Sequence, residues 1–437
     1  MERPLIEKIR PDRGPLDIKE YERLGGYQAA KKALYKMTPK EVMDTVKDSN
    51  LRGRGGAGFP TAQKWSFVPM GDDAPHPKYL IANADEMEPG TFKDRLLLEC
   101  NPHQLIEGMI ISAYAVQADI AYIFLRSEYR LAAKRVMSAI TEAYKSKYLG
   151  EHIMGSGYSL EMRLHTSVGR YICGEETALL NALEGKRAVP RAKPPFPQVT
   201  GLFGKPTVVN NVETLSNISH IIGKGAEWFK GLSLSTDSGT KIYGVSGRVK
   251  RPGLWELPIG TTIGEIIEEH AGGMKDGVGF RAVIPGGAST EFLTKEHFGV
   301  KMDYDSVQKA GSRLGTGMMI VLDDRTCPVG MVHNLEKFFA HESCGWCTPC
   351  REGLPWTEKI LHAIEEGRGE QGDIEKLESL AGLMGMGKTF CALAPGAMEP
   401  LQSALKLFRD DFQRHINEKR CHYKGTVPIY GRSEAES

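Results

Sequence analysis

Three cysteines at two-residue spacings, Cys344, Cys347 and Cys350, form the pattern that points most directly to chemistry, and Cys391 follows 41 residues later. A tight turn with three thiols suits three irons on one side of a cubane, and a distant thiolate closes the fourth corner. Zinc sites usually come as paired CxxC units, so a four-cysteine zinc site is the alternative, and buried cysteines without metal are a further one. Because iron–sulfur centres carry single electrons, the pattern favours electron transfer over hydrolysis.

A glycine-rich loop at residues 53–58 has four glycines in six residues. Its backbone N–H groups can approach a phosphate or a flat ring, and Lys64 adds a cation. The loop lacks the Gly-Lys-Ser/Thr ending of a Walker A motif and is not a clean GxGxxG between strand and helix. A flexible turn without a ligand is therefore an equal alternative.

Polar side chains follow a strand-like run at residues 79–82, namely Asn83, Asp85, Glu86 and Glu88. Open α/β sheets bind ligands at the carboxyl ends of their strands, so these groups can bind ribose hydroxyls or the edge of a flavin. The alternative is a solvated acidic loop.

A second acidic segment, residues 169–177, reads as a β-like stretch that breaks into a helix with Glu175 and Glu176 in its first turn. Such acids can simply complement the helix dipole. Beside an adenosine ribose they would also favour NADH over NADPH. Further on, a proline run presents Lys193 and Phe196, and residues 210–214 resemble a capped helix start.

The length and composition of the chain limit the number of its domains and the kinds of partner it can have. With 437 residues, two to four domains are expected. A net charge of +1 gives no reason to expect a nucleic acid or an anionic membrane as partner. The longest apolar stretch, residues 105–125, is too polar to span a bilayer, and the first residues lack the features of a secretory signal. We therefore expect a cytoplasmic chain whose eight cysteines are not disulfides.

We predict three domains. Residues 1–240 alternate helical and strand-like patterns, which predicts an α/β Rossmann-like domain. Residues 241–330 combine short strands with one helix that starts at a Thr262-x-x-Glu265 capping box, which predicts a ubiquitin-like β-grasp domain. Residues 331–437 predict a helical bundle around the cysteine cluster, with a disordered tail over the final dozen residues.

In detail, we expect helices over 101–116 and 129–148, strands over 120–126, 241–245, 254–257 and 280–284, and one periodic helical face from Leu401 to Phe412.

Taken together, the motifs GRGGAGFPT, NADExEPG, YICGEETAL, KPPFP, GKPTVVNNVET and ESCGxCTPCREG resemble one family, the NADH-binding flavoprotein subunits of respiratory complex I (NADH:quinone oxidoreductase). The likeness covers residues 22–417. It implies FMN beside an NADH pocket in the α/β domain, then a ubiquitin-like domain of the soluble-ligand-binding type, and a helical bundle with a 4Fe–4S cluster.

The resemblance also implies site residues. The FMN contacts are Gly53, Arg54, Gly55, Lys64, Asn83, Asp85, Glu86, Gly174, Asn210, Asn211 and Thr214. The NADH contacts are Gly56, Phe59, Phe67, Glu88, Tyr171, Glu175, Glu176, Lys193 and Phe196. The cluster ligands are Cys344, Cys347, Cys350 and Cys391, and Glu88 is the candidate catalytic residue. Ala62 departs from the family, where many relatives have glycine.

The implied activity is hydride transfer from NADH to FMN, followed by single-electron transfer through the cluster toward quinone. The implied partners are a thioredoxin-like 2Fe–2S subunit and a multi-cluster Fe–S subunit, which hold the chain at the cytoplasmic face of the bacterial inner membrane without direct insertion. The family also contains flavoprotein subunits of NAD-linked hydrogenases and formate dehydrogenases, which often carry extra domains that this sequence has no room for.

Two other classes of protein remain open: a zinc-stapled nucleotide-binding scaffold without activity, and a nucleotide-sensing regulator.

Overall fold

The computed structural model describes residues 2–71 and 73–423, and these form two compact units. Of the described residues, the first unit comprises 2–71, 73–87, 91–243 and 254–261, and the second comprises 88–90, 244–253 and 262–423. The predicted disordered tail, with Gly431, Ser433 and Ser437, lies outside the described residues. None of the helices in the described ranges combines the length and the apolar character that crossing a membrane requires.

The first unit is built on a four-stranded sheet with the order β3-β2-β1-β4. Its strands are β1 (Tyr79–Ala84), β2 (Ile120–Leu125), β3 (Glu161–Thr166) and β4 (Thr207–Asn211). All three pairings are parallel, and Tyr79 lies opposite Ile120 on one side and Thr207 on the other. The strand order reverses between β1 and β4, which is the point at which open α/β sheets bind ligands. Because these two strands are adjacent and parallel, their carboxyl ends lie at the same edge of the sheet.

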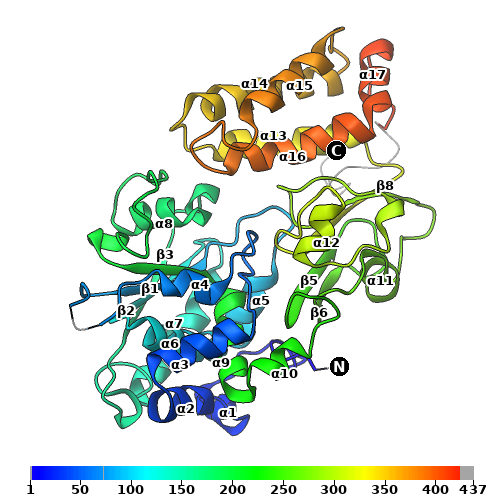
Figure 1. Cartoon of the computed structure of the whole chain (residues 1–437). Coiled ribbons are helices and arrows are strands. Elements are labelled where there is room, and N and C mark those ends of the chain that lie inside the picture. The colour runs from blue at the N-terminus through cyan, green and yellow to red at the C-terminus, as the bar shows by residue number, and fades with distance from the viewer. Residues whose placement is uncertain (1, 72, 424–437) are drawn as a thin grey trace. The chain divides into compact units, whose positions relative to one another are not determined.

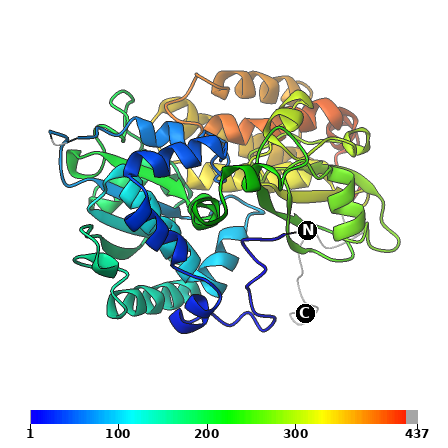
Figure 2. The same ribbon diagram turned by 60° about the horizontal axis from the view of Figure 1, so that its bottom comes forward.

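Helices gather around this sheet (Figure 1 and Figure 2). They are α1 (Ile18–Arg23), α2 (Gln28–Lys36), α3 (Pro39–Asp48), α4 (Thr61–Ser66), α5 (Lys93–Cys100), α6 (Pro102–Val116), α7 (Arg130–Lys145), α8 (Glu176–Leu183), α9 (Val212–Lys224) and α10 (Ala226–Lys230). The centre of the unit is apolar α6, which packs against α9. A Cβ on Gly108 would lie 2.0 Å from the carbonyl oxygen of Leu215, so only glycine permits this close approach.

A second sheet has the order β6-β5-β8-β7, with strands β5 (Thr240–Ser246), β6 (Gly253–Pro258), β7 (Phe280–Ile284) and β8 (Met318–Asp323). Strand β5 pairs with β8 in parallel, whereas β7 pairs with β8 antiparallel. The short helix α11 (Ile263–Glu265) starts at the Thr262 capping box, and α12 (Tyr304–Lys309) precedes β8. This arrangement confirms the predicted β-grasp fold.

The C-terminal helices are α13 (Pro328–Glu342), α14 (Thr348–Glu365), α15 (Asp373–Met384), α16 (Leu393–Leu407) and α17 (Arg409–Glu418). Apolar side chains of α16 and α17, from Leu401 to Phe412, are buried as the periodicity predicted. This apolar face is divided between two helices, because Phe408 leaves helical geometry between α16 and α17. The fold class is thus confirmed, while the domain boundaries at 240/241 and 330/331 stay predictions.

Candidate functional site

A cavity of about 840 Å³ opens in the first unit at the carboxyl edge of the parallel sheet. Its walls come from the glycine-rich loop, α4, the ends of β1 and β4, the start of α8 and the proline run. The lining residues are Gly53, Gly55, Gly56, Ala57, Gly58, Phe59, Gln63, Lys64, Phe67, Asn83, Gly174, Glu176, Phe196, Gln198, Val199, Val209, Asn210, Asn211 and Thr214. A cavity of this size accepts a cofactor or a drug-sized ligand.

The glycine-rich loop is a closed turn. The N–H of Gly53 donates to the carbonyl of Phe59 over 2.9 Å, which brings the two ends of the loop together. Gly56 has a φ of +133°, a conformation that L side chains rarely adopt, and a Cβ on Gly55 would lie 3.1 Å from Asn211 Cβ. These glycines are therefore required by the turn, and they leave backbone open to the cavity.

Arg54 lies buried behind this loop. Its N–H donates to Thr214 Oγ1 over 2.8 Å, and its Nη2 donates to the carbonyl oxygens of Ser238 and Thr240. Within the described residues, its Nε and Nη1 have no hydrogen-bond partner. Burying a guanidinium with unsatisfied donors is costly. Because Arg54 is 0% exposed and does not line the cavity, these donors face the protein interior and not the cavity.

A chain of charges lies in the cavity wall. Lys64 Nζ donates to Glu176 Oε2 over 2.7 Å and to the carbonyl of Val209 over 2.9 Å. Lys193 Nζ contacts both Glu175 and Glu176. Burial alone would raise the pKa of Glu176, but the two lysines lower it, so this carboxylate stays charged.

Glu175 also caps a helix. Its Oε2 accepts hydrogen bonds from the N–H groups of Thr177 and Ala178 at the start of α8. This geometry agrees with the helix-terminus explanation of this acid, and its predicted NADH contact stays a prediction. The β-like stretch expected before α8 is wrong, because residues Tyr171–Gly174 form a 3-10 turn that packs against α8 instead of pairing with a strand.

Three aromatic side chains line the cavity and face solvent: Phe59, Phe67 and Phe196 are 45%, 49% and 53% exposed. The rings of Phe59 and Phe67 lie 6.4 Å apart. Large apolar side chains exposed together around a concavity mark a ligand site, and their faces suit a flat ring.

Three asparagines hold the floor of the cavity. Asn83 Nδ2 donates to the carbonyl of Gly174, and Asn210 Oδ1 accepts from Trp65 Nε1 over 2.9 Å. Asn211 Oδ1 caps α9 by accepting from the N–H of Glu213, which confirms the predicted capped start of this helix. The orientation of these amides is therefore fixed by the protein.

A buried ionic network lies beneath this floor. Glu213 Oε2 lies 2.7 Å from Lys93 Nζ and 3.2 Å from Lys241 Nζ, and Asp94 lies 2.8 Å from Lys93. Asn211 Nδ2 donates to Asp94 and thereby joins the network to the cavity. Burial would raise the pKa of Glu213, but Lys241 and Lys93 lower it to about 2. Glu213 is therefore charged at neutral pH, while burial lowers the pKa of Lys241 to about 7.

Some predicted contact residues do not line the cavity, namely Arg54, Asp85, Glu86, Glu88, Tyr171, Glu175 and Lys193. Asp85 accepts from Ser167, and Glu86 accepts from the N–H groups of Asp94 and Arg95. Burial, together with the charge of Asp94, raises the pKa of Glu86 to about 7.

Glu88 belongs to the second unit, where its Oε1 accepts from the N–H of Ser289 over 2.6 Å. Its catalytic role stays a prediction. The sequence reasoning missed six lining residues, Ala57, Gly58, Gln63, Gln198, Val199 and Val209. Gln63 and Gln198 belong to no motif, and only their position next to motif residues could have indicated them.

The predicted iron–sulfur cysteines gather around the start of α14. Cys347 is the residue before this helix and Cys350 lies in its first turn. Trp346 and Phe390, which neighbour Cys347 and Cys391, have rings 6.3 Å apart. The distant fourth cysteine therefore lies beside the turn that carries the others.

These four thiols do not meet as closely as ligands of one ion would. Burial raises the pKa of Cys350 to about 12, and the charges of Cys347, Cys391 and Cys344 add to the rise. Even so, within residues 2–71 and 73–423 no three of these thiols all lie within 4.8 Å of one another. This wider spacing suits a cubane better than a single zinc ion.

Sequence profiles of known families match three parts of the chain. The Nuo51 FMN-binding domain matches residues 46–220, the SLBB domain matches residues 242–292, and the NADH-ubiquinone oxidoreductase-F iron-sulfur binding region matches residues 330–415. The F subunit of NADH-quinone oxidoreductase from Salmonella typhimurium is 56% identical over 415 residues, which are 95% of this chain and 93% of that protein. The chain belongs to the family of NADH-quinone oxidoreductase F subunits. The Escherichia coli member is also 56% identical over 95% of this chain and 93% of its own length.

Solved structures add a more distant similarity. An NAD+-reducing [NiFe]-hydrogenase in the air-oxidized state has a chain that is 34% identical with a TM-score of 0.78, covering 96% of this chain and 69% of the other. The same enzyme in the H2-reduced state gives a TM-score of 0.79 at 34% identity, covering 93% of this chain and 67% of the other.

These findings confirm the predicted family, the fold class, and the assignment as an oxidoreductase subunit with FMN and a 4Fe–4S cluster. The individual site residues stay predictions.

Proposed function

We propose that this chain oxidises NADH by hydride transfer to FMN held in the cavity, and passes single electrons to a 4Fe–4S cluster on Cys344, Cys347, Cys350 and Cys391. The observation that carries this proposal is the cavity itself, where a glycine turn, a lysine and three exposed aromatic rings meet at the carboxyl edge of a parallel sheet. Bound FMN would supply two-electron acceptance and one-electron release.

The residues of this chain position the reactants. The glycine turn and Lys64 would hold the phosphate and ring of the flavin, since they combine open backbone with a fixed cation. The fixed amides of Asn83, Asn210 and Asn211 would set the orientation of the ring edge. Such orientation, rather than an acid or base, is what hydride transfer requires.

On the nucleotide side, Phe59, Phe67 and Phe196 would hold the adenine between exposed rings. The carboxylates of Glu175 and Glu176 would repel a 2′-phosphate and so favour NADH over NADPH. Their pairing with Lys193 and Lys64 reduces this repulsion, so the preference should rest on the geometry of the ribose contact as well as on charge.

Electrons leave the chain through partner proteins. We propose a thioredoxin-like 2Fe–2S subunit and a multi-cluster Fe–S subunit as partners that carry electrons toward quinone, and a peripheral place at the cytoplasmic face of the bacterial inner membrane.

Visible spectroscopy of the purified protein tests the proposal. We expect a yellow-brown protein whose flavin absorption bleaches with NADH and which reduces ferricyanide. A colourless protein with zinc in place of iron, or one that binds NADH without turnover, would contradict it.

A role in an NAD-linked hydrogenase is the second candidate, because the solved hydrogenase chains share the fold. The quinone oxidoreductase relatives match at 56% identity over nearly their whole length, against 34% for the hydrogenase chain, which favours the first candidate.

A further inference from the structure

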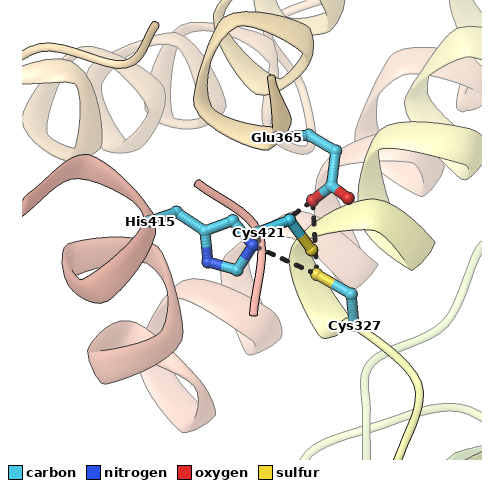
Figure 3. Close-up of side chains that lie close together, drawn as sticks. All are labelled: Cys327, Glu365, His415 and Cys421. Atoms are coloured by element: carbon cyan, nitrogen blue, oxygen red, sulfur yellow. Dashed lines mark hydrogen bonds and ion pairs between the residues drawn. The ribbon is translucent and has the colours of Figure 1, made fainter. Parts of the chain in front are cut away.

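Four buried side chains converge on one point in the second unit, away from the iron–sulfur motif. Cys327, Glu365, His415 and Cys421 each offer one ligand atom, and these atoms all lie within 4.8 Å of one another (Figure 3). The four residues are 0%, 8%, 0% and 6% exposed. None belongs to the motifs assigned to flavin, nucleotide or iron–sulfur binding, and in the sequence they span 95 residues.

The distances within this cluster are those of a tetrahedral ion site. Cys327 Sγ lies 3.2 Å from Glu365 Oε2 and 3.4 Å from His415 Nε2, and His415 Nε2 lies 3.4 Å from Glu365 Oε2. Zinc bonds of about 2.0–2.3 Å in a tetrahedron place neighbouring ligand atoms about 3.3–3.8 Å apart. The donor set of two thiols, one imidazole and one carboxylate is also one that zinc prefers.

Surrounding hydrogen bonds prepare two of the donors. Nδ1 of His415 lies 2.6 Å from the carbonyl oxygen of Asp411, which fixes the proton on Nδ1 and turns the Nε2 lone pair toward the cluster. Cys327 caps α13, and its Sγ accepts from the N–H of Gly330 over 3.3 Å. A helix N-terminus stabilises a thiolate, which is the form that binds a metal.

The cluster joins the end of the described chain to the helices of the iron–sulfur motif. Cys327 precedes α13, Glu365 ends α14, and His415 and Cys421 belong to α17 and the segment after it. Helices α13 and α14 pack against each other, and the turn between them carries Cys344 and Cys347. With α13 15 residues long, the cluster lies roughly 22 Å from that turn at 1.5 Å per residue.

From this geometry we infer that Cys327, Glu365, His415 and Cys421 form a structural zinc site that fastens α17 to the opposite end of the α13–α14 helix pair. A bound Zn²⁺ offsets the free-energy cost of burying two thiols, a carboxylate and an imidazole in one place, because it takes all four as ligands. Such a site contributes to folding directly, since it does not exist in the unfolded chain.

Metal analysis of the full-length protein, purified without chelator, tests this site. We expect about one zinc per chain in addition to the cluster iron. Cys421→Ser and His415→Gln should each lower the zinc content at least tenfold while the iron content is kept. Cys100→Ser, a buried cysteine of the first unit, and His362→Gln, in a half-exposed His333–Glu358–His362 group, are matched controls that should keep the zinc.

X-ray absorption at the zinc edge of the wild-type protein needs no variant that might misfold. Two sulfur and two nitrogen or oxygen ligands are expected. Four sulfur ligands would place the zinc on the Cys344 motif and overturn the inference, as would zinc that is lost from His362→Gln alone. Absence of zinc, with or without a Cys327–Cys421 disulfide in the mass spectrum, would also overturn it.

Discussion

Lys64 Nζ and Glu176 Oε2 lie 2.7 Å apart in the wall of the cavity, where the two side chains come from different helices, α4 and α8. Both are largely buried, so the ion pair is screened less than one at the surface. The pair fixes the lysine in the position where the proposed flavin contact needs it. The carboxylate in turn stays ionised because Lys64 and Lys193 contact its two oxygens and lower its pKa.

Replacing this lysine should weaken flavin binding. Lys64→Met removes a cation and leaves Glu176 with Lys193 as its partner, so we expect FMN affinity to fall about tenfold or more, which corresponds to about 1.4 kcal/mol. Flavin fluorescence released on dilution measures the dissociation constant. Lys186→Met is the control, because Lys186 also pairs with a glutamate but is exposed and outside the cavity. Equal FMN affinity in Lys64→Met and wild type would exclude the proposed contact.

Loss of an exposed aromatic ring should weaken the binding of NADH more than the binding of FMN. Phe67→Ala should raise the KM for NADH roughly two- to tenfold with a smaller effect on kcat, because a stacked aromatic pair contributes about 0.5–1.5 kcal/mol. Steady-state kinetics with ferricyanide as acceptor separates the two constants. Phe203→Ala serves as control, since Phe203 is 56% exposed but does not line the cavity. A similar KM change in both variants would argue against a specific adenine contact.

The buried network makes Glu213 a stability residue. Glu213→Gln leaves Lys241 without a carboxylate partner, while Lys93 keeps Asp94, and breaking a buried ion pair costs roughly 3–5 kcal/mol. Urea unfolding followed by circular dichroism measures this change. Glu227→Gln, on the exposed surface of α10, should change stability little. Comparable stability in the two variants would show that the network contributes nothing.

The same carboxylate gives stability a dependence on pH. Its pKa is about 2 in the folded chain, against an ordinary value of 4.5. The folded state therefore binds fewer protons between these values, so the contribution of Glu213 is complete above pH 4.5 and is lost as pH falls toward 2. Unfolding free energies measured from about pH 6 downward should fall more steeply for wild type than for Glu213→Gln. Parallel curves would disprove this assignment.

Glu88 needs an experiment that separates catalysis from structure, because its carboxylate accepts from the N–H of Ser289. If Glu88 lies beside the nicotinamide, Glu88→Gln should raise the KM for NADH and lower kcat while the melting temperature changes little. A lower melting temperature with unchanged kinetic constants would assign Glu88 a structural role only. Glu151→Gln is the control variant, because it also removes one negative charge.

Local signals predicted the elements well where they were strong. Residues 280–284 form β7 as expected, and the capping box at Thr262 starts α11. The β-like stretch expected before α8 is wrong, because residues Tyr171–Gly174 form a 3-10 turn that leads directly into α8. Phe408 interrupts a helix although its side chain keeps the apolar period, so periodicity alone predicted the burial but not the break.

The residues of the candidate site were also predicted only in part. Glycines and aromatic residues of motifs line the cavity, whereas Gln63 and Gln198 became visible only through the fold. Cys327 and Cys421 read as scattered cysteines in the sequence, because their partners Glu365 and His415 are brought to them by the packing of three helices. Pairing across such distances depends on topology, which residue spacing does not reveal.

Asn211 links three parts of the first unit. Its side chain lines the cavity, its oxygen caps α9 and its nitrogen donates to Asp94 of the buried network. A replacement at this position is therefore not confined to the pocket, because it disturbs the first turn of α9 and the buried charges at the same time.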